Sequence, residues 1–455
     1  MRVNRNVLSA SQTAEKRWLK FLASFDHTDD RRSRIEEIAS HHRQGKVCRV
    51  IQRFQGAFNY CFRLRFDEDG EEWILRFPVL GNTMNPLAKA QNEVAVMHFL
   101  REKTTIPVPK VIAFSVATGD FVGLGPYIIM EFVDGIPLDD VLLDEKDGRL
   151  RDVSDSVLEK IYRQIARIYL QLFTHSFPKI GALSMEETES DRVWSVTSGP
   201  LTFKMNEIER MGGVRVGASD APYDSTIDYF NALAEQSLLH LRNNPLASQD
   251  EEEARGDYQS IYTLKLMAKH FAAKHDTPFR LFCDDLRFGN ILVDKSYTIV
   301  AIIDWEFCYA APAAFLCSPP WWLTGTEPFE WSDRDLENYD AKLKVFLELL
   351  EEEEEEGRYG LGHTLSSLMR EFRRDGTFWY NLAIRESFPL AGVMRHCLDT
   401  KPFQNPQSPD DLEEFSRCKM NQRQEYENFI RTREANQGDG RHISQLGQEN
   451  DGIAL

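Results

Sequence analysis

The sequence predicts an α+β protein with two lobes: a small lobe built on an antiparallel sheet, followed by a larger, mainly helical lobe. Strand-like segments follow one another closely between Cys48 and Val133, and after Gly135 long segments with helical periodicity dominate. The length of 455 residues exceeds the size at which one hydrophobic core usually stops growing, so two cores are expected. A ligand site is expected in the cleft between two such lobes.

The predicted boundaries divide the chain into four parts. Residues 1–44 form an N-terminal helical extension, residues 45–134 the small lobe, residues 135–400 the large lobe, and residues 401–455 a polar tail. The hinge between the lobes falls near Glu131 to Gly135. The end of the tail, Gln437 to Leu455, is polar enough that we expect disorder there.

Alternating apolar residues and turn signals define the small lobe. The pair Asp69-Gly70 is a strong hairpin signal between two of the strands. A helix with an apolar side is expected from Leu87 to Lys103. The predicted strands are CRVIQRF, NYCFRLRF, EEWILRFP, IPVPKVIAF and YIIMEFV, with Val-Gly-Leu-Gly-Pro as the turn before the last of them.

The large lobe is predicted to be helical around one hairpin. The hairpin covers Ile291 to Asp304, and further helices follow it to about Leu398. The acidic segment Asp250 to Arg255, DEEEAR, is expected to be an exposed loop. Helices are expected at Val157 to Phe173, Thr226 to Leu241 and Ile261 to Lys274.

The charge balance excludes one class of ligand. The chain has 54 Lys+Arg against 72 Asp+Glu and a net charge of −18, whereas nucleic-acid binding needs a basic surface. An acidic surface is compatible with a cationic small molecule, although the run Glu351 to Glu356, expected on a solvated helical face or loop, supplies six of the charges. We therefore expect a small-molecule partner, and nothing in the sequence indicates an obligate protein partner.

The cysteines and the apolar segments bear on the compartment. The 7 cysteines are scattered and include no C-x-x-C pair, which favours reduced thiols inside the cell. No apolar run approaches the roughly 20 residues that cross a bilayer, so no membrane partner is expected. We expect a cytoplasmic protein. The basic, Ser-containing N-terminus is the basis of a second, mitochondrial interpretation, and a surface helix explains it equally well.

One cluster of polar residues in the large lobe has the spacing needed for phosphoryl transfer. That reaction needs a carboxylate to position the attacking hydroxyl, oxygen ligands for Mg²⁺ and cations on the phosphates. Asp285 and Asn290 stand five apart, and Asp304 follows Asn290 by 14 at the end of the hairpin, so Asn290 and Asp304 can converge on one metal ion. Arg287 is placed to contact the transferring phosphate, and Glu306 is a further metal or supporting carboxylate. The alternative is a capped polar turn.

The small lobe supplies matching groups for a nucleotide. Arg76 ends a strand and Glu93 follows by 17 on the next helix, so the two can pair and hold phosphates. The alternative is a surface ion pair. In QGAFN, Gln55 to Asn59, backbone N–H groups near Gly56 and Asn59 could cradle a phosphate, or the segment is a plain turn.

Two further patterns have simpler explanations. Gly123-Leu124-Gly125 lacks a third glycine and a helix start, so it is a turn and no dinucleotide-binding motif. The aromatic segment SPPWWL, Ser318 to Leu323, could wall a substrate pocket, but packing beneath a loop is the commoner role for such residues.

The sequence resembles the aminoglycoside phosphotransferase and choline kinase-like family, in particular its fungal branch, from about Cys48 to Leu323. The segments that carry the resemblance are FNYCFRLRF with WILRFP, NEVAVMHFLRE with IPVPKVIAF, YIIMEFVDGIPL, GPLTFKMNEIERMGG, CDDLRFGNILVD, and IIDWEFCYAAPAAF with PPWWL.

The resemblance implies a protein-kinase-like bilobal fold and ATP- and Mg²⁺-dependent phosphorylation of a small-molecule hydroxyl. It implies that Asp285 is the catalytic base, that Asn290 and Asp304 bind the metal, and that Arg76 with Glu93 anchors the phosphates. The segment Met130 to Val133, including Glu131 and Val133, is implied to bind adenine through its backbone.

The chain departs from the family pattern at two positions. Cys283 stands where the catalytic loop usually begins with His, and a Cys there is expected to replace the His in packing but not in hydrogen bonding. Arg76 stands where Lys is common, and its planar guanidinium changes the phosphate geometry. Asp284 lacks the partners of Asp285, so a structural role is expected for it.

Two other functions stay open at the sequence level. One is a nucleotide-binding pseudokinase that acts as a scaffold. Such a protein would have lost the catalytic base or a metal ligand, whereas this chain retains Asp285, Asn290 and Asp304. A protein kinase is disfavoured, because WEFCYAAP follows Asp304 in place of D-F-G and an activation segment.

Overall fold

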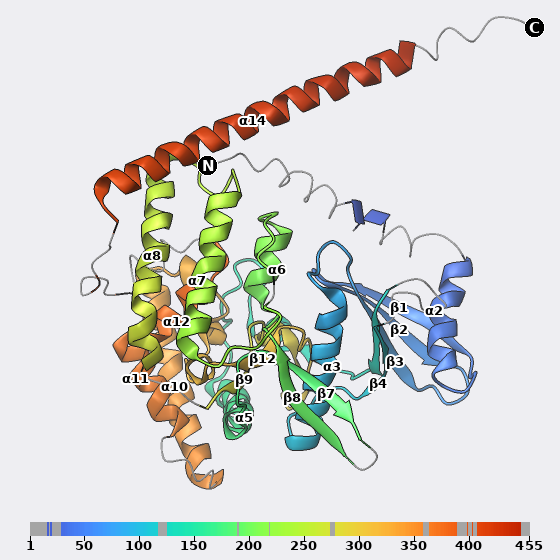
Figure 1. Cartoon of the computed structure of the whole chain (residues 1–455). Coiled ribbons are helices and arrows are strands. Elements are labelled where there is room, and N and C mark those ends of the chain that lie inside the picture. The colour runs from blue at the N-terminus through green and yellow to red at the C-terminus, as the bar shows by residue number, and fades with distance from the viewer. Residues whose placement is uncertain are drawn as a thin grey trace, which may run out of the picture.

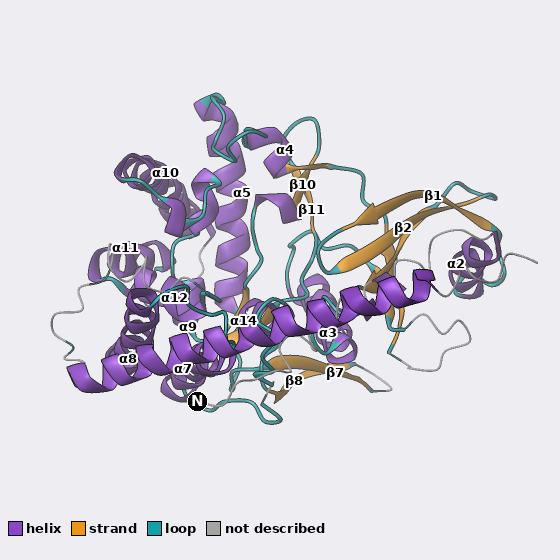
Figure 2. Cartoon of the chain, turned by 90° about the horizontal axis from the view of Figure 1, so that it is seen from above, coloured by secondary structure: helices purple, strands orange, loops and turns teal. Residues whose placement is uncertain are grey.

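The computed structural model has the two-lobed, protein-kinase-like architecture that the sequence predicts (Figure 1). It describes residues 16–17, 19–20, 29–116, 125–188, 191–217, 219–273, 278–357, 364–388, 398, 403 and 407–446. The first residues of the predicted N-terminal extension and the Gly123-Leu124 part of the predicted turn lie outside these ranges. Figure 2 shows the strands of the small lobe at one side of the molecule and most helices at the other.

The small lobe is a five-stranded antiparallel sheet in the order β1-β2-β3-β5-β4. Its strands are β1 (Cys48–Gln55), β2 (Asn59–Phe66), β3 (Glu72–Pro78), β4 (Val111–Ser115) and β5 (Tyr127–Glu131). Alternating residues of these strands form a buried core, because successive side chains of a strand point to opposite faces of the sheet. Helix α2 (Asp29–His41) packs beside β1, and α3 (Pro86–Lys103) lies between the sheet and the large lobe.

A short strand connects the lobes and places the hinge over the predicted hairpin. Strand β6 (Ile136–Pro137) pairs with β10 (Ile291–Val293), which pairs with β11 (Ile299–Ile302). Only glycine fits before β6, since a Cβ on Gly135 would lie 2.9 Å from Leu292 Cβ.

Helices make up most of the large lobe, around a second pair of short strands. Strands β9 (Arg280–Cys283) and β12 (Cys308–Ala311) pair antiparallel and flank the segment that holds the predicted catalytic residues. The helices are α4 (Leu138–Leu142), α5 (Asp155–Thr174), α6 (Phe203–Arg210), α7 (Thr226–Asn243), α8 (Glu251–Ala273), α9 (Ala313–Leu316), α10 (Asp333–Gly357), α11 (Leu365–Asp375), α12 (Thr377–Arg385) and α14 (Pro409–Leu446), with the 3₁₀ turns η1 (Phe288–Asn290), η2 (Trp321–Thr324) and η3 (Pro328–Glu330).

Three parts of the large lobe differ from the prediction. The segment DEEEAR is not a loop: Glu251 to Glu253 form the first turn of α8, where carboxylates are stabilised by the helix dipole. The polar end of the chain is helical up to Leu446, in α14, where disorder was expected from Gln437, and residues 447–455 of that prediction lie outside the described ranges. Strands β7 (Ala182–Glu187) and β8 (Arg192–Ser198) form a hairpin against α3 that the sequence did not indicate.

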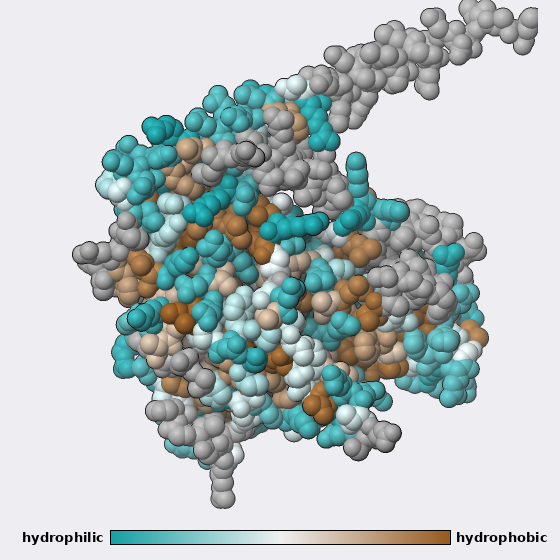
Figure 3. Space-filling view, viewed as in Figure 1, coloured by the Kyte–Doolittle hydropathy of each residue, from teal (hydrophilic) through white to brown (hydrophobic). Residues whose placement is uncertain are grey.

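The acidic run Glu351 to Glu356 lies in helix α10, so the helical face was the correct one of the two predicted structures. One residue of the run is nevertheless buried. Glu353 bonds Arg163 and Arg167 of α5 and so joins the two helices. The face in Figure 3 is mostly hydrophilic, with apolar residues in separate patches. Among the described residues, no helix is both long enough and apolar enough to span a bilayer.

Candidate active site

The predicted catalytic loop, called the catalytic loop below, runs from the end of β9 into β10 and brings three predicted residues together. Arg287 Nε donates to Asp285 Oδ1 at 2.9 Å, and Asn290 Nδ2 donates to the backbone oxygen of Asp285 at 2.7 Å and to its Oδ2 at 3.2 Å. Burial raises the pKa of Asp285, and the bonds from Arg287 and Asn290 oppose that rise. Asp285 is thus a desolvated carboxylate in a fixed orientation.

Asp304 follows β11 and lies beside Asn290 because the two strands pair. Ile303 N donates to the backbone oxygen of Asn290 at 2.9 Å, which sets the register at this end of the hairpin. The backbone of Asp304 is left-handed, with φ of 63°, an uncommon state for a residue with a Cβ. Such conformations concentrate at functional sites, where surrounding contacts hold them.

The predicted pair from the small lobe meets Asp304 across the cleft. Arg76 Nη2 contacts Glu93 Oε2, and Arg76 Nη1 lies 3.4 Å from Asp304 Oδ1. Arg76 and Glu93 are 7% and 2% exposed, so they are no surface ion pair. Arg76 therefore joins the sheet, helix α3 and the large lobe.

Asn290 and Asp304 have the chemistry of a Mg²⁺ site. Burial and the nearby Glu306 raise the pKa of Asp304 well above its usual range, although Arg76 opposes this rise. In addition, Glu93 Oε1 is buried and has no hydrogen-bond partner among the described residues. No group of three or more His, Cys, Asp or Glu side chains in the described residues is arranged to hold a metal alone. One carboxylate and one amide suit Mg²⁺, which takes its other ligands from phosphates and water.

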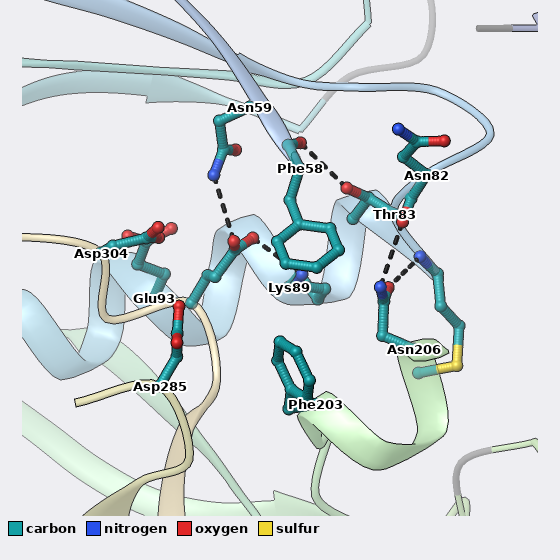
Figure 4. Close-up of polar contacts among 12 residues, drawn as sticks. Phe58, Asn59, Asn82, Thr83, Lys89, Glu93, Phe203, Asn206, Asp285 and Asp304 are labelled. Carbon is teal, nitrogen blue, oxygen red and sulfur yellow. Dashed lines mark hydrogen bonds and ion pairs between the residues drawn. The ribbon is translucent and has the colours of Figure 1, made fainter. Parts of the chain in front are cut away.

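A buried ion pair that the sequence did not indicate supports this segment from α3. Lys89 Nζ lies 2.7 Å from Glu306 Oε2, and both side chains are almost fully buried. Asn59 Nδ2 donates to Glu306 Oε1 at 3.1 Å (Figure 4). Lys89 precedes Glu93 by four residues and so shares its face of α3, which is the signal that could have identified it. Glu306 thus acts as a support between the lobes in this structure.

The loop of Gly56 and Asn59 is closed by a backbone hydrogen bond. Gly56 N donates to the backbone oxygen of Asn59 at 2.9 Å, so that N–H group closes the turn. The side chain of Asn59 faces Glu306. The N–H group of Gly56 is therefore in use within the turn, and binding of a phosphate by the other N–H groups of this loop stays a prediction.

The hinge residues are only partly available to a nucleotide. Glu131 N donates to the backbone oxygen of Lys110 at 3.0 Å, and its side chain accepts a bond from Lys110 N at 2.8 Å. Glu131 therefore has its N–H group in use. Val133 lies beyond the end of β5, and its implied role in binding adenine stays a prediction.

Cys283 is buried in the β9–β12 pair and takes part in a weak hydrogen bond. It lies opposite Cys308 in the β9–β12 pair and is 6% exposed. Its Sγ donates to the backbone oxygen of Asp304 over 4.0 Å. The thiol thus contacts the residue that holds the strained backbone, and its long distance fits a weak sulfur donor.

Asp284 has the structural role that we expected. Its carboxylate accepts a bond from Phe203 N at 3.3 Å and lies 3.4 Å from Arg385 Nη1, so it joins α6 to α12. Burial raises the pKa of Asp284.

A pocket of about 400 Å³ opens beside the catalytic loop. Asp285 and Arg287 lie in its wall. The remaining wall consists of Ala57, Phe58, Phe203, Glu207, Arg210, Asp284, Trp321, Glu327, Pro328, Phe329, Leu382, Arg385, Glu386 and Ser387. Because Ala57 and Phe58 belong to the small lobe, the pocket is closed by both lobes.

The two tryptophans of SPPWWL have different roles: one lines a pocket and the other packs beneath a loop. Trp321 lines the pocket. Trp322 is buried and packs against Phe288 of the catalytic loop, with ring centroids 5.0 Å apart. The first is therefore a wall residue and the second a packing residue.

Two curated fungal proteins are similar to this chain in sequence. The chain is 23% identical over 362 residues to "Altered inheritance of mitochondria protein 9, mitochondrial" of Yarrowia lipolytica, covering 72% of this chain and 59% of that protein. It is 22% identical over 266 residues to "Clavilactone A biosynthesis cluster protein Y" of Ampulloclitocybe clavipes, covering 56% and 60%. The chain thus spans about three fifths of the length of these curated relatives.

Similar solved structures are distant. A Plasmodium vivax ethanolamine kinase has 14% identity and a TM-score of 0.42, over 81% of this chain and 80% of that one. An aminoglycoside phosphotransferase of Streptomyces rimosus has 16% identity and a TM-score of 0.39, over 74% and 93%.

A match to a protein-family model identifies the family of this chain. The model described as "Phosphotransferase enzyme family" matches residues 50–315, more than half of the chain. The match includes Arg76, Glu93, the catalytic loop and Asp304. The chain belongs to the phosphotransferase enzyme family.

Proposed function

We propose that this protein uses ATP and Mg²⁺ to phosphorylate a hydroxyl group of a small molecule. The observation that carries the proposal is the position of Asp285. It lies in the wall of a pocket of small-molecule size and is bonded to Asn290. The backbone oxygen of Asn290 accepts a bond from Ile303 N, next to Asp304, and Asp304 lies 3.4 Å from Arg76. An acceptor hydroxyl in the pocket would thus lie between a carboxylate base and the groups for a metal and phosphates.

Each polar residue has one role in the proposed reaction. The acceptor oxygen forms a bond to the γ-phosphorus of ATP, its proton passes to Asp285, and the bond to ADP breaks. Arg287 is placed to contact the transferring phosphoryl group, and Arg76 to hold the phosphates that remain on ADP. Asn290 and Asp304 would hold Mg²⁺, which neutralises charge on the phosphates when it is bound.

The charges of the pocket favour a cationic acceptor. Each arginine of the wall has an acidic neighbour: Arg210 with Glu207, Arg287 with Asp285 and Arg385 with Asp284. Two more carboxylates, Glu327 and Glu386, line the pocket, and none of the ion pairs recorded among the described residues includes them. Desolvation and the nearby Glu386 raise the pKa of Glu327. A positive charge on the acceptor would relieve this repulsion, and Trp321 offers an aromatic face for it.

The test is turnover of Mg·ATP by the purified protein with a panel of amino alcohols and neutral alcohols. We expect phosphorylated product with at least one amino alcohol. Asp285→Asn should lower kcat by about 10²- to 10⁴-fold, because the base is lost while the fold is kept. Asp294→Asn is the matched control, since Asp294 lies in the exposed turn of the same hairpin and bonds only its local backbone and Ser296.

Two results would contradict the proposal. Full turnover by Asp285→Asn would remove Asp285 from the chemistry. A thermal shift with ATP but no product with any acceptor would favour the nucleotide-binding scaffold over the enzyme.

A further inference from the structure

The loop above the cleft is attached to the large lobe through a short turn. The backbone oxygens of Ala57 and Phe58 accept bonds from the side chains of Asn82 at 3.0 Å and Thr83 at 3.1 Å. The backbone oxygen of Phe58 also accepts a hydrogen bond from Val79 N at 2.7 Å. The tip of the loop is therefore held by the turn before α3 and cannot lift without it.

Asn206 of α6 holds that turn from the other lobe (Figure 4). Its Oδ1 accepts a bond from Met84 N at 2.8 Å, and its Nδ2 donates to the backbone oxygen of Asn82 at 3.1 Å. The side chain of Asn206 is fully buried, at 0% exposure. A buried amide that loses these partners stays unsatisfied, so the two contacts resist opening.

An aromatic cluster adds a second contact between the same segments. The Phe58 ring lies 5.8 Å from that of Phe203 on α6 and 5.4 Å from that of Phe307, and Phe203 and Phe307 are 5.2 Å apart. The angles between these rings are 73° to 87°, which is the favourable edge-to-face arrangement. Thus the loop, α6 and the segment after Asp304 share one apolar contact.

Helix α6 also forms part of the proposed acceptor pocket. Phe203, Glu207 and Arg210 of α6 line the pocket, as does Phe58 of the loop. The backbone N–H of Phe203 is bonded to Asp284, next to the proposed base. A movement of α6 is therefore transmitted to the loop on one side and to the catalytic loop on the other.

We propose that Asn206 is a positioning residue that clamps the Gly56–Asn59 loop to α6, so that nucleotide binding under the loop and acceptor binding against α6 favour each other. Asn206 touches neither substrate. Its effect passes through Asn82 and Met84 to the loop. The clamp itself rests on the contacts above, whereas the coupling of the two ligands rests on the proposed function.

Hydrogen–deuterium exchange of the full chain without ligands tests the clamp. In Asn206→Leu, the peptides that cover residues 56–60 and 80–85 should exchange about tenfold faster, because two buried hydrogen bonds are lost. Asn206→Asp keeps the acceptor for Met84 N, so it should show a smaller increase. The control Met211→Ala changes an exposed residue at the end of α6 and should leave these peptides unchanged. Equal exchange in all variants would overturn the clamp.

The same measurement with Mg²⁺ and the ATP analogue AMP-PNP tests the coupling. In the wild type, the analogue should slow exchange in both the loop peptide and the α6 peptide, residues 203–210. In Asn206→Leu it should slow only the loop. Protection of α6 that persists in the variant, or that never occurs in a wild type that binds the analogue, would overturn the coupling. A wild type that does not bind the analogue would instead overturn the proposed function, and the ligand-free comparison would still decide the clamp.

The clamp can still be tested if the variant Asn206→Leu does not fold. If Asn206→Leu does not fold, Asn206→Asp and Phe58→Leu replace it, because each removes one half of the contact between the loop and α6. Faster exchange of residues 80–85 in the first and of residues 56–60 in the second is expected. Wild-type exchange in both would contradict the proposal.

Discussion

Lys89 and Glu306 form a buried salt bridge directly beneath the cleft, and each is the other's main charged partner. Their side chains are 2% and 3% exposed, and Lys89 Nζ also lies 3.8 Å from the centroid of the Phe307 ring. Burying two charges is costly, so the pair itself adds little net stability, whereas the loss of one member leaves the other as an unpaired buried charge. The pair therefore fixes where the segment after Asp304 lies relative to α3.

Removing one member should reveal this coupling. Lys89→Met should lower the free energy of unfolding by about 3–5 kcal/mol, because Glu306 becomes an unpaired buried charge. The double variant Lys89→Met/Glu306→Gln should lose about 1–3 kcal/mol less than the sum of the single variants. Urea unfolding measures all three. Lys344→Met, at an exposed lysine of α10, is the control, and strict additivity would show that the two residues do not interact.

At the residue scale, the sequence predicted the residues whose spacing is local. Asp285, Asn290 and Asp304 lie on one loop and hairpin, so their offsets in the chain already place them together. Lys89 and Asn206 were not predicted, because their partners are 217 and 122 to 124 residues away and only the packing of the lobes creates the contacts. Cys283 was judged by its chemistry, and its weak bond to Asp304 depends on a strand pairing that the sequence did not indicate.

At the scale of elements, helix α6 is attached to α12 by a buried lysine. Lys204 is 2% exposed, and its Nζ donates to the backbone oxygen of Ile384 at 2.8 Å. Burial lowers the pKa of Lys204 to about 7, although Glu386 and Asp284 oppose the shift. The position of α6 thus depends on an amine that titrates near neutral pH.

This depressed pKa makes the stability of the protein depend on pH. The folded protein releases the proton near pH 7, while the unfolded chain keeps it up to about pH 10.5. The contribution of Lys204 to the free energy of unfolding therefore rises across this window, by about 2 kcal/mol between pH 7 and about pH 9. Lys204→Met should lack this rise in urea unfolding at the two pH values, whereas Lys344→Met should keep it. Parallel profiles for wild type and Lys204→Met would contradict the prediction.

The β7–β8 hairpin and the start of α8 were not predicted from the sequence, for different physical reasons. The β7–β8 hairpin is held by tertiary contacts to α3, since Leu183 N donates to Asn92 Oδ1 and Trp194 Nε1 to the backbone oxygen of Ala95. The acidic start of α8 was interpreted by its charge alone, although carboxylates also favour the first turn of a helix. By contrast, strands β2 and β3 were predicted because alternation and Asp69-Gly70 are local signals.

At the scale of the whole molecule, helix α14 runs along the top of the large lobe and towards the small lobe (Figures 1 and 2). Its first turns pack on α8: the Phe415 ring stacks on Tyr258 with centroids 3.9 Å apart. Lys419 Nζ donates to the backbone oxygens of Leu241 and Asn244, at the end of α7. Leu241 lies in the last turn of α7, where carbonyl groups lack partners within a helix, and Asn244 follows the helix directly, so α14 caps the end of α7.

Shortening the chain should therefore destabilise the large lobe. Removal of residues 409–455, or Phe415→Ala alone, should lower Tm by about 5–10 °C, because an apolar contact and the bonds at the end of α7 are lost. Thermal unfolding followed by circular dichroism measures the change. Arg431→Ala, at an exposed site farther along α14, is the control. An unchanged Tm after the truncation would show that α14 is not part of the folded unit.

The sequence predicted the division into two lobes because hydrophobic periodicity changes at Gly135, and the structure confirms that division. It could not predict how the lobes meet, since that depends on side chains distant in the chain. The cytoplasmic compartment, the alternative mitochondrial one and the identity of the acceptor stay predictions.

Helix α3 is joined to the segment from Asp304 to Cys308 at three neighbouring positions. Lys89 meets Glu306, Asn92 donates to the backbone oxygen of Cys308 at 2.8 Å, and Glu93 meets Arg76, which reaches Asp304. Any displacement of α3 would therefore break or strain all three attachments together, so α3 and the segment after Asp304 are expected to move as one body.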